Sequence, residues 1–106
     1  MQLFNLNDMI KGWFIGSFKP SVVDSNDFEV ACKRYRQGDY EECHVHKVST
    51  EITLIVEGSV RMQGRDLHAN DIVMLNPGEP SDFLALSDAV TVVVKFPSRP
   101  DDKYKI

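Results

Sequence analysis

Cysteine is scarce in this sequence: among 106 residues there are two, Cys32 and Cys43. Small secreted domains that depend on disulfides have a much higher density of cysteine, so that class of protein is excluded. The first residues also lack a basic stretch followed by an apolar run, which is the pattern of a signal peptide. We therefore expect a cytoplasmic protein with reduced thiols.

Long apolar runs and an excess of positive charge are missing as well. The strongest apolar run, Ala89 to Val94, is far shorter than the roughly 20 residues that a membrane-spanning helix needs. Twelve Lys and Arg against sixteen Asp and Glu give a formal net charge of −4. This balance disfavours a broad surface for nucleic acid or anionic lipid, so we expect neither nucleic acid nor a membrane as a partner.

The chain does have the size and composition of one globular domain. Its length falls near the range of about 100–150 residues typical of a compact domain, and 42% of its residues are hydrophobic and 26% charged. We expect a single domain over residues 1–106, with an N-terminal arm at 1–26, a barrel at 27–97 and a tail at 98–106.

The two terminal segments differ in character. The arm is rich in aromatic residues, and we expect Trp13, Phe14 and Phe18 to cover the protein's own core or, alternatively, to pack against a second subunit. The tail contains Pro100 and several charges. We expect it to cross the surface as irregular chain.

Short alternating or β-branched apolar blocks dominate the central part of the chain, whereas helical spacing is hard to find. Turn residues such as Gln63-Gly64-Arg65 and Asn76-Pro77-Gly78 separate the blocks. The pattern predicts an all-β protein, a sandwich, jelly roll or barrel. The predicted strands are Phe28 to Tyr35, Glu42 to Val48, Glu51 to Val56, Ser59 to Gln63, Ile72 to Leu75, Asp82 to Leu86 and Val90 to Phe96.

A pair of histidines lies inside one predicted strand. Successive side chains of a strand alternate between faces, so His44 and His46 point the same way, while Cys43 shares the opposite parity and is expected to be a buried structural thiol. Glu51 follows five residues later, at the start of the next strand. Two imidazoles and one carboxylate suit Fe(II), Mn, Ni, Cu or Zn.

The wider spacing around these residues matches a known motif, G-x5-H-x-H-x3,4-E-x6-G, at every fixed position. The fixed positions are Gly38, His44, His46, Glu51 and Gly58. In this respect the segment from Phe28 to Phe96 resembles the cupin superfamily. The resemblance implies a double-stranded β-helix, the antiparallel jelly-roll barrel of that family, with His44, His46 and Glu51 as metal ligands.

The second cupin motif, G-x5-P-x-G-x2-H-x3-N, is degraded in this chain. Gly78 agrees with it, but Asn70, Asn76 and Ala85 do not, and Ser81 stands where the family has a third histidine ligand. Either three protein ligands suffice and leave open coordination positions, or the site is weak and empty. Ser81 and Asp82 are the candidates for a fourth ligand, Asp82 only through a one-residue register shift.

Other charged residues receive simpler interpretations. His68 has no motif support and is expected to be solvated, as are Glu41 and Glu42. Lys95 is expected on the outer sheet face. Arg34 either lies on that face too or projects into the barrel to bind an anionic ligand.

The resemblance implies a small metalloprotein with one divalent ion, Fe, Mn, Ni or Zn. We expect it to bind or transform a small oxygen-rich molecule such as a sugar derivative or a keto acid. The alternative is a non-catalytic binding or sensing barrel whose degenerate site holds no metal, and a structural accessory subunit is a third interpretation. The residues from Val90 to Val94 are apolar on both faces of their strand, which favours a homodimer.

Overall fold

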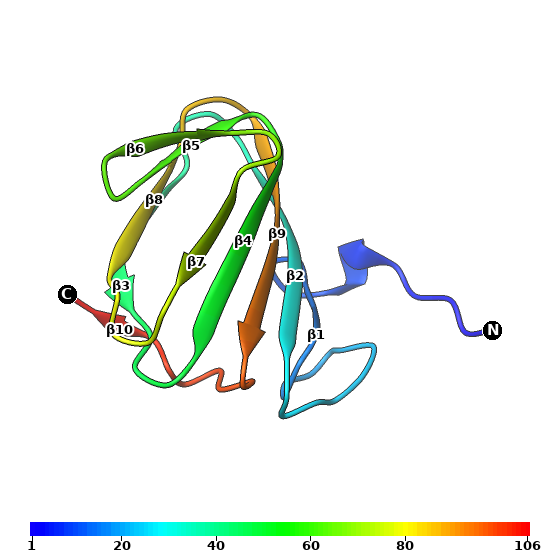
Figure 1. Cartoon of the computed structure of the whole chain (residues 1–106). Coiled ribbons are helices and arrows are strands. Elements are labelled where there is room, and N and C mark those ends of the chain that lie inside the picture. The colour runs from blue at the N-terminus through cyan, green and yellow to red at the C-terminus, as the bar shows by residue number, and fades with distance from the viewer.

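A computed structural model describes all 106 residues and confirms the all-β prediction. Two five-stranded antiparallel sheets pack against each other (Figure 1). In spatial order, the first sheet contains β1 (Trp13–Ile15), β2 (Glu29–Tyr35), β9 (Ala89–Phe96), β4 (Thr50–Glu57) and β7 (Ile72–Leu75). The second contains β10 (Tyr104–Lys105), β3 (Tyr40–Val45), β8 (Ser81–Ala85), β5 (Ser59–Met62) and β6 (Arg65–His68).

Apolar side chains from both sheets form the core between them. Strand β9 illustrates this packing. Its residues alternate regularly between buried and half-buried positions, which is the pattern of a strand with one face on a core. The core residues are Ile55, Val60, Met62, Leu75, Phe83, Ala85 and Ala89.

The seven predicted strands correspond to β2 to β5 and β7 to β9, with shifted ends. Strand β3 ends at Val45, so His46 lies just beyond it. Strand β6 was not predicted. It follows β5 through Gln63 and Gly64, whose φ angles of 51° and 72° suit a tight hairpin turn.

The terminal segments are more ordered than the sequence indicates. Strand β1 of the arm pairs with β2. The tail is mostly irregular and exposed, as predicted, but β10 pairs with β3 and Asp102 is only 2% exposed. Both ends of the chain therefore add a strand to the barrel.

Helical structure is limited to the short 3-10 helix η1 (Leu6–Asp8), which Asn5 caps. The chain has no helix with the length and apolar character needed to cross a membrane.

Candidate metal centre

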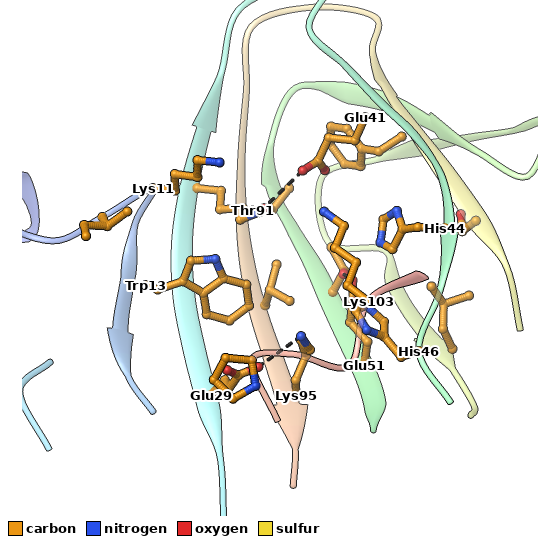
Figure 2. Close-up of a pocket in the computed structure, with 18 of the residues that line it drawn as sticks. Lys11, Trp13, Glu29, Glu41, His44, His46, Glu51, Thr91, Lys95 and Lys103 are labelled. Carbon is orange, nitrogen blue, oxygen red and sulfur yellow. Dashed lines mark hydrogen bonds and ion pairs between the residues drawn. The ribbon is translucent and has the colours of Figure 1, made fainter. Parts of the chain in front are cut away.

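A cavity of about 360 Å³ opens between the two sheets, beside the apolar core (Figure 2). Residues of both sheets and of both terminal segments line it, including Trp13, His44, Glu51 and Lys103. The cavity therefore has polar and charged walls, which distinguishes it from the apolar core.

The three predicted metal ligands converge in this cavity. One candidate donor atom from each of His44, His46 and Glu51 lies within 4.8 Å of the other two. The two imidazole rings are 5.2 Å apart and nearly perpendicular. His46 Nε2 lies 2.9 Å from Glu51 Oε2. This is a spacing that a single ion can bridge with small side-chain movements.

A β-bulge in β3 helps to orient the site. Glu41 pairs with Phe83 and His44 with Ser81, so three residues of β3 advance against two of β8. The extra residue lets both Glu41 and His44 line the cavity. The expectation that Glu41 is simply solvated is therefore wrong: its carboxylate accepts hydrogen bonds from Tyr35 Oη and Lys33 Nζ.

Backbone carbonyl groups fix both imidazole rings. His44 Nδ1 lies 2.9 Å from the carbonyl oxygen of Glu42, and His46 Nδ1 contacts the carbonyl oxygen of Asp102. A carbonyl oxygen only accepts hydrogen bonds, so each Nδ1 is the protonated donor nitrogen. Each Nε2 is then the nitrogen available to the cavity, and this donor set fits a divalent metal ion.

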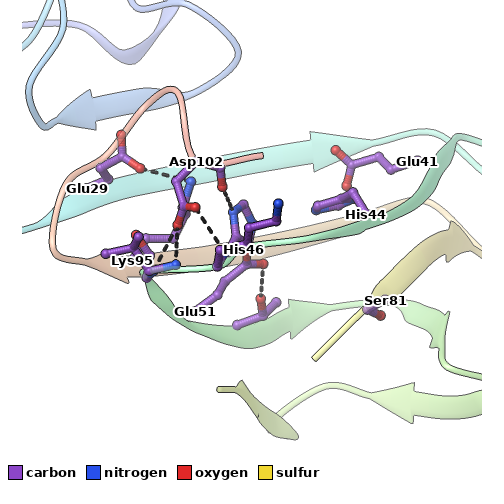
Figure 3. A network of polar contacts seen from close by, with 12 residues as sticks. Glu29, Glu41, His44, His46, Glu51, Ser81, Lys95 and Asp102 are labelled. Carbon is purple, nitrogen blue, oxygen red and sulfur yellow. Dashed lines mark hydrogen bonds and ion pairs between the residues drawn. The ribbon is translucent and has the colours of Figure 1, made fainter. Parts of the chain in front are cut away.

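Asp102 also fixes the turn that connects His46 to β4 (Figure 3). Its carboxylate accepts hydrogen bonds of 2.9 Å each from the backbone N–H groups of Lys47, Val48 and Ser49. Burial alone would raise the pKa of this carboxyl group, but the three N–H donors outweigh burial and lower the pKa. Sequence reasoning missed this residue, because a single aspartate in a charged tail carries no motif.

Buried charged groups surround the Glu51 carboxylate. The prediction for Lys95 is wrong: it faces inward, is 6% exposed, and forms an ion pair of 3.0 Å with buried Glu29. Burial would raise the pKa of Glu51, but the hydrogen bond and charge of His46, with the charge of Lys95, lower it overall. Glu51 is thus held as the carboxylate, the form that binds a metal.

The candidates for a fourth ligand lie in different environments. Ser81 pairs with His44 across the sheet, is buried and lines the cavity, and its hydroxyl donates to the carbonyl oxygen of Asp82. Asp82 also lines the cavity, but its carboxylate accepts a hydrogen bond from the Gln63 N–H. No register shift brings Asp82 into the ligand group, so the candidate centre has three strong donors.

Two other residues considered from the sequence lie away from the centre. Arg34 is exposed and pairs with Val90 on the outer face, whereas its neighbour Lys33 lines the cavity, so Arg34 does not project into the barrel. His68 is exposed, as predicted, and contacts the Ser59 hydroxyl.

The aromatic arm forms the opposite end of the cavity. Trp13 and Phe18 both line it and pack edge to face, with ring centroids 6.4 Å apart. The ammonium groups of Lys33 and Lys95 lie 5.3 and 5.5 Å from the Trp13 ring. These distances suit cation–π contacts.

No protein-family model matches the sequence, and no curated protein matches it. Solved structures do resemble it. KdgF from Halomonas sp. superposes with a TM-score of 0.66 at 23% identity, over 73% of this chain and 74% of that chain. An RmlC-like cupin from Shewanella frigidimarina gives a TM-score of 0.64 at 19% identity, over 72% and 71%.

A third similar structure is oxalate decarboxylase from Bacillus subtilis, a protein with Mn(II) centres. Its TM-score is 0.66 at 22% identity, over 77% of this chain and 25% of that chain. At these identities the likeness concerns the fold alone.

Proposed function

Since the protein has the cupin fold, we propose that it binds one divalent metal ion, Fe, Mn, Ni or Zn, through His44, His46 and Glu51. We further propose that it uses this site to bind or transform a small oxygen-rich molecule such as a sugar derivative or a keto acid. The similarity in fold to a manganese-containing oxalate decarboxylase supports the choice of ligand class.

The observation that carries the proposal is the direction of the imidazole nitrogens. With both Nδ1 atoms donating to carbonyl oxygens, the Nε2 atoms of His44 and His46 are left for the cavity in which the Glu51 carboxylate lies. A bound ion would act as a Lewis acid for oxygen ligands. Three protein donors leave coordination positions for such a molecule.

The contact between His46 and Glu51 indicates how the site is organised before metal binding. Nε2 and Oε2 are 2.9 Å apart, so a proton must lie between them. Metal binding has to displace this proton, so the proposal includes proton release on binding.

The proposal is tested by titrating protein without a histidine tag with Mn, Fe, Ni and Zn salts. We expect one ion per chain for the wild type and a sharp loss of affinity for His44→Ala. His68→Ala is the matched control, because it removes an exposed imidazole outside the cavity and leaves the affinity unchanged. A wild type without stoichiometric metal under all four conditions refutes the proposal.

A second candidate function is a non-catalytic binding barrel without metal. Ser81 in place of a fourth ligand favours it, as does the contact of His46 with Glu51, which gives both groups a partner without an ion. The metal titration separates this candidate from the first. If metal binds, product analysis after incubation with candidate acids and sugars distinguishes an enzyme from a metal-dependent binding protein.

A further inference from the structure

Lys103 brings a positive charge to the candidate metal centre from the C-terminal tail. It lines the same cavity as His44, His46 and Glu51. Figure 2 shows its side chain extending into the cavity where these three residues converge. No sequence motif indicates this role, because the residue lies outside both cupin motifs.

The backbone on both sides of Lys103 is held in place. On one side, the buried Asp102 carboxylate accepts three backbone hydrogen bonds. On the other side, Tyr104 and Lys105 pair with β3, and the Lys47 ammonium lies 4.0 Å from the centre of the Tyr104 ring. The position of Lys103 at the cavity is therefore set by the fold, although the residue itself is exposed.

Lys103 has no acidic partner, unlike the cavity lysines of the first sheet; Lys11 and Lys19 of the arm also line the cavity without one. Lys33 lies 3.5 Å from Glu41, and Lys95 lies 3.0 Å from Glu29. None of the ion pairs in the structure includes Lys103. Its charge is available to a ligand in the cavity.

The charge balance then favours an anion. This step rests on the proposed function: a divalent ion bound by two neutral imidazoles and the Glu51 carboxylate leaves one net positive charge, and Lys103 adds a second. We propose that Lys103 binds the carboxylate of the ligand. The ligands are then small organic acids with a keto or hydroxyl oxygen next to the carboxylate, in preference to neutral sugars.

In this arrangement one carboxylate of the ligand contacts both the metal ion and Lys103. The ligand's carboxylate and its neighbouring oxygen would fill coordination positions that the three protein donors leave open. The ammonium group of Lys103 would donate hydrogen bonds to the same carboxylate. Specificity for an acid over its uncharged amide follows, because the amide carries no charge for Lys103 to neutralise.

The test is calorimetric titration of the manganese-loaded protein with pyruvate and, separately, with pyruvamide. For Lys103→Met we expect the same manganese affinity as the wild type and pyruvate affinity weaker by about tenfold, the usual effect of losing one charge-assisted hydrogen bond. Lys103→Arg should retain most of the affinity. Lys105→Met is the matched control, since it removes an equal charge two residues further along the same segment, at a residue that pairs with Glu42.

The outcomes separate the two proposals. A wild type that binds no metal refutes the proposed function. If metal binds but Lys103→Met and Lys105→Met bind pyruvate equally well, the role of Lys103 is refuted while the metal site stands. Manganese-loaded wild type that binds pyruvamide as tightly as pyruvate, or that binds neither, also overturns the inference.

Discussion

The Nδ1 atoms of two imidazole rings in this protein contact backbone carbonyl groups. The partner of His44 is the carbonyl oxygen of Glu42, two residues away, and that of His46 is the carbonyl oxygen of Asp102, far along the chain. The orientation of His44 is therefore local to β3. That of His46 depends on the position of the tail.

Ser81 offers a test of the open coordination position. It is buried, lines the cavity and pairs with His44, so a histidine there would add an imidazole beside the other two. We expect Ser81→His to tighten metal binding and to weaken binding of a chelating acid, because one open position is filled. Competition between the protein and a fluorescent metal indicator measures the first effect.

Asp82→Ala is the companion variant. The Asp82 carboxylate is already engaged by the Gln63 N–H, so metal affinity should not change. An unchanged affinity for Ser81→His would show that this part of β8 does not approach the ion. A marked loss for Asp82→Ala would show that Asp82 is a ligand after all.

The C-terminal segment is the element on which the candidate centre depends most. It adds β10 to the edge of the second sheet, and it supplies the Asp102 contacts to His46 and to the turn that follows it. One short segment therefore stabilises the barrel and orients a candidate ligand. These two roles can be measured separately.

Asp102→Ala should lower the free energy of unfolding by about 3 kcal/mol, because three backbone N–H groups lose a charged acceptor. Metal affinity should fall by about 10- to 100-fold, as is usual when a group that orients a ligand is lost. Denaturant titration and metal titration measure the two effects. Asp101→Ala, at an exposed neighbouring carboxylate, should change neither.

Comparison of wild type with Asp102→Ala also gives a pH test. The pKa of Asp102 is lowered in the folded protein. Its contribution to stability is therefore complete above the unfolded pKa of about 3.9 and is lost as the pH falls through the lower folded value. The stability difference between wild type and Asp102→Ala should be constant near neutral pH and shrink below about pH 4. A difference that grows on acidification would contradict this assignment.

Local sequence patterns predict much of the fold and of the candidate metal centre, but not all of either. Alternation and turn residues predict the central strands, and the spacing of His44, His46 and Glu51 predicts the ligand group. The alternation of apolar and polar residues does not identify the buried face of β9, because valines occupy both faces. The prediction that Lys95 lies on the outer face was wrong for that reason. The role of Asp102 depends on a contact across more than fifty residues, which no local pattern records.

At the scale of the whole molecule, the outer faces of the two sheets differ. The outer face of the second sheet carries exposed ion pairs, such as Arg61 with Asp66 and Lys105 with Glu42. On the first sheet, register and burial place apolar side chains on the outer face of four adjacent strands. These side chains are Val30, Cys32, Ile52, Leu54, Ile72, Met74, Val90, Val92 and Val94.

We propose that this apolar face packs against the same face of a second copy of the chain. From ordinary strand spacing and rise, the face measures about 15 Å in each direction. It would form the apolar centre of a symmetric interface of about 800 Å² per partner. Two copies of such a face can pack together because few charged side chains would repel one another across the interface.

The prediction is a dimer at micromolar concentration, with twice the mass of one chain in light scattering. Met74→Glu should give a monomer that remains folded, because Met74 is 56% exposed within one chain. Tyr40→Glu, at a residue of the second sheet that is 58% exposed, is the control and should remain dimeric. A monomeric wild type, or a Met74→Glu variant that stays dimeric, would remove this proposal.

The central claim is that His44, His46 and Glu51 hold one metal ion, and anomalous diffraction from crystals grown with Mn²⁺ tests it most directly. The account predicts one strong anomalous peak per chain, within coordination distance of both Nε2 atoms and of a Glu51 carboxylate oxygen. Crystals of His44→Ala grown in the same way should lack the peak. A wild-type cavity without a peak, or an ion bound elsewhere with the contact between His46 and Glu51 intact, would contradict the account.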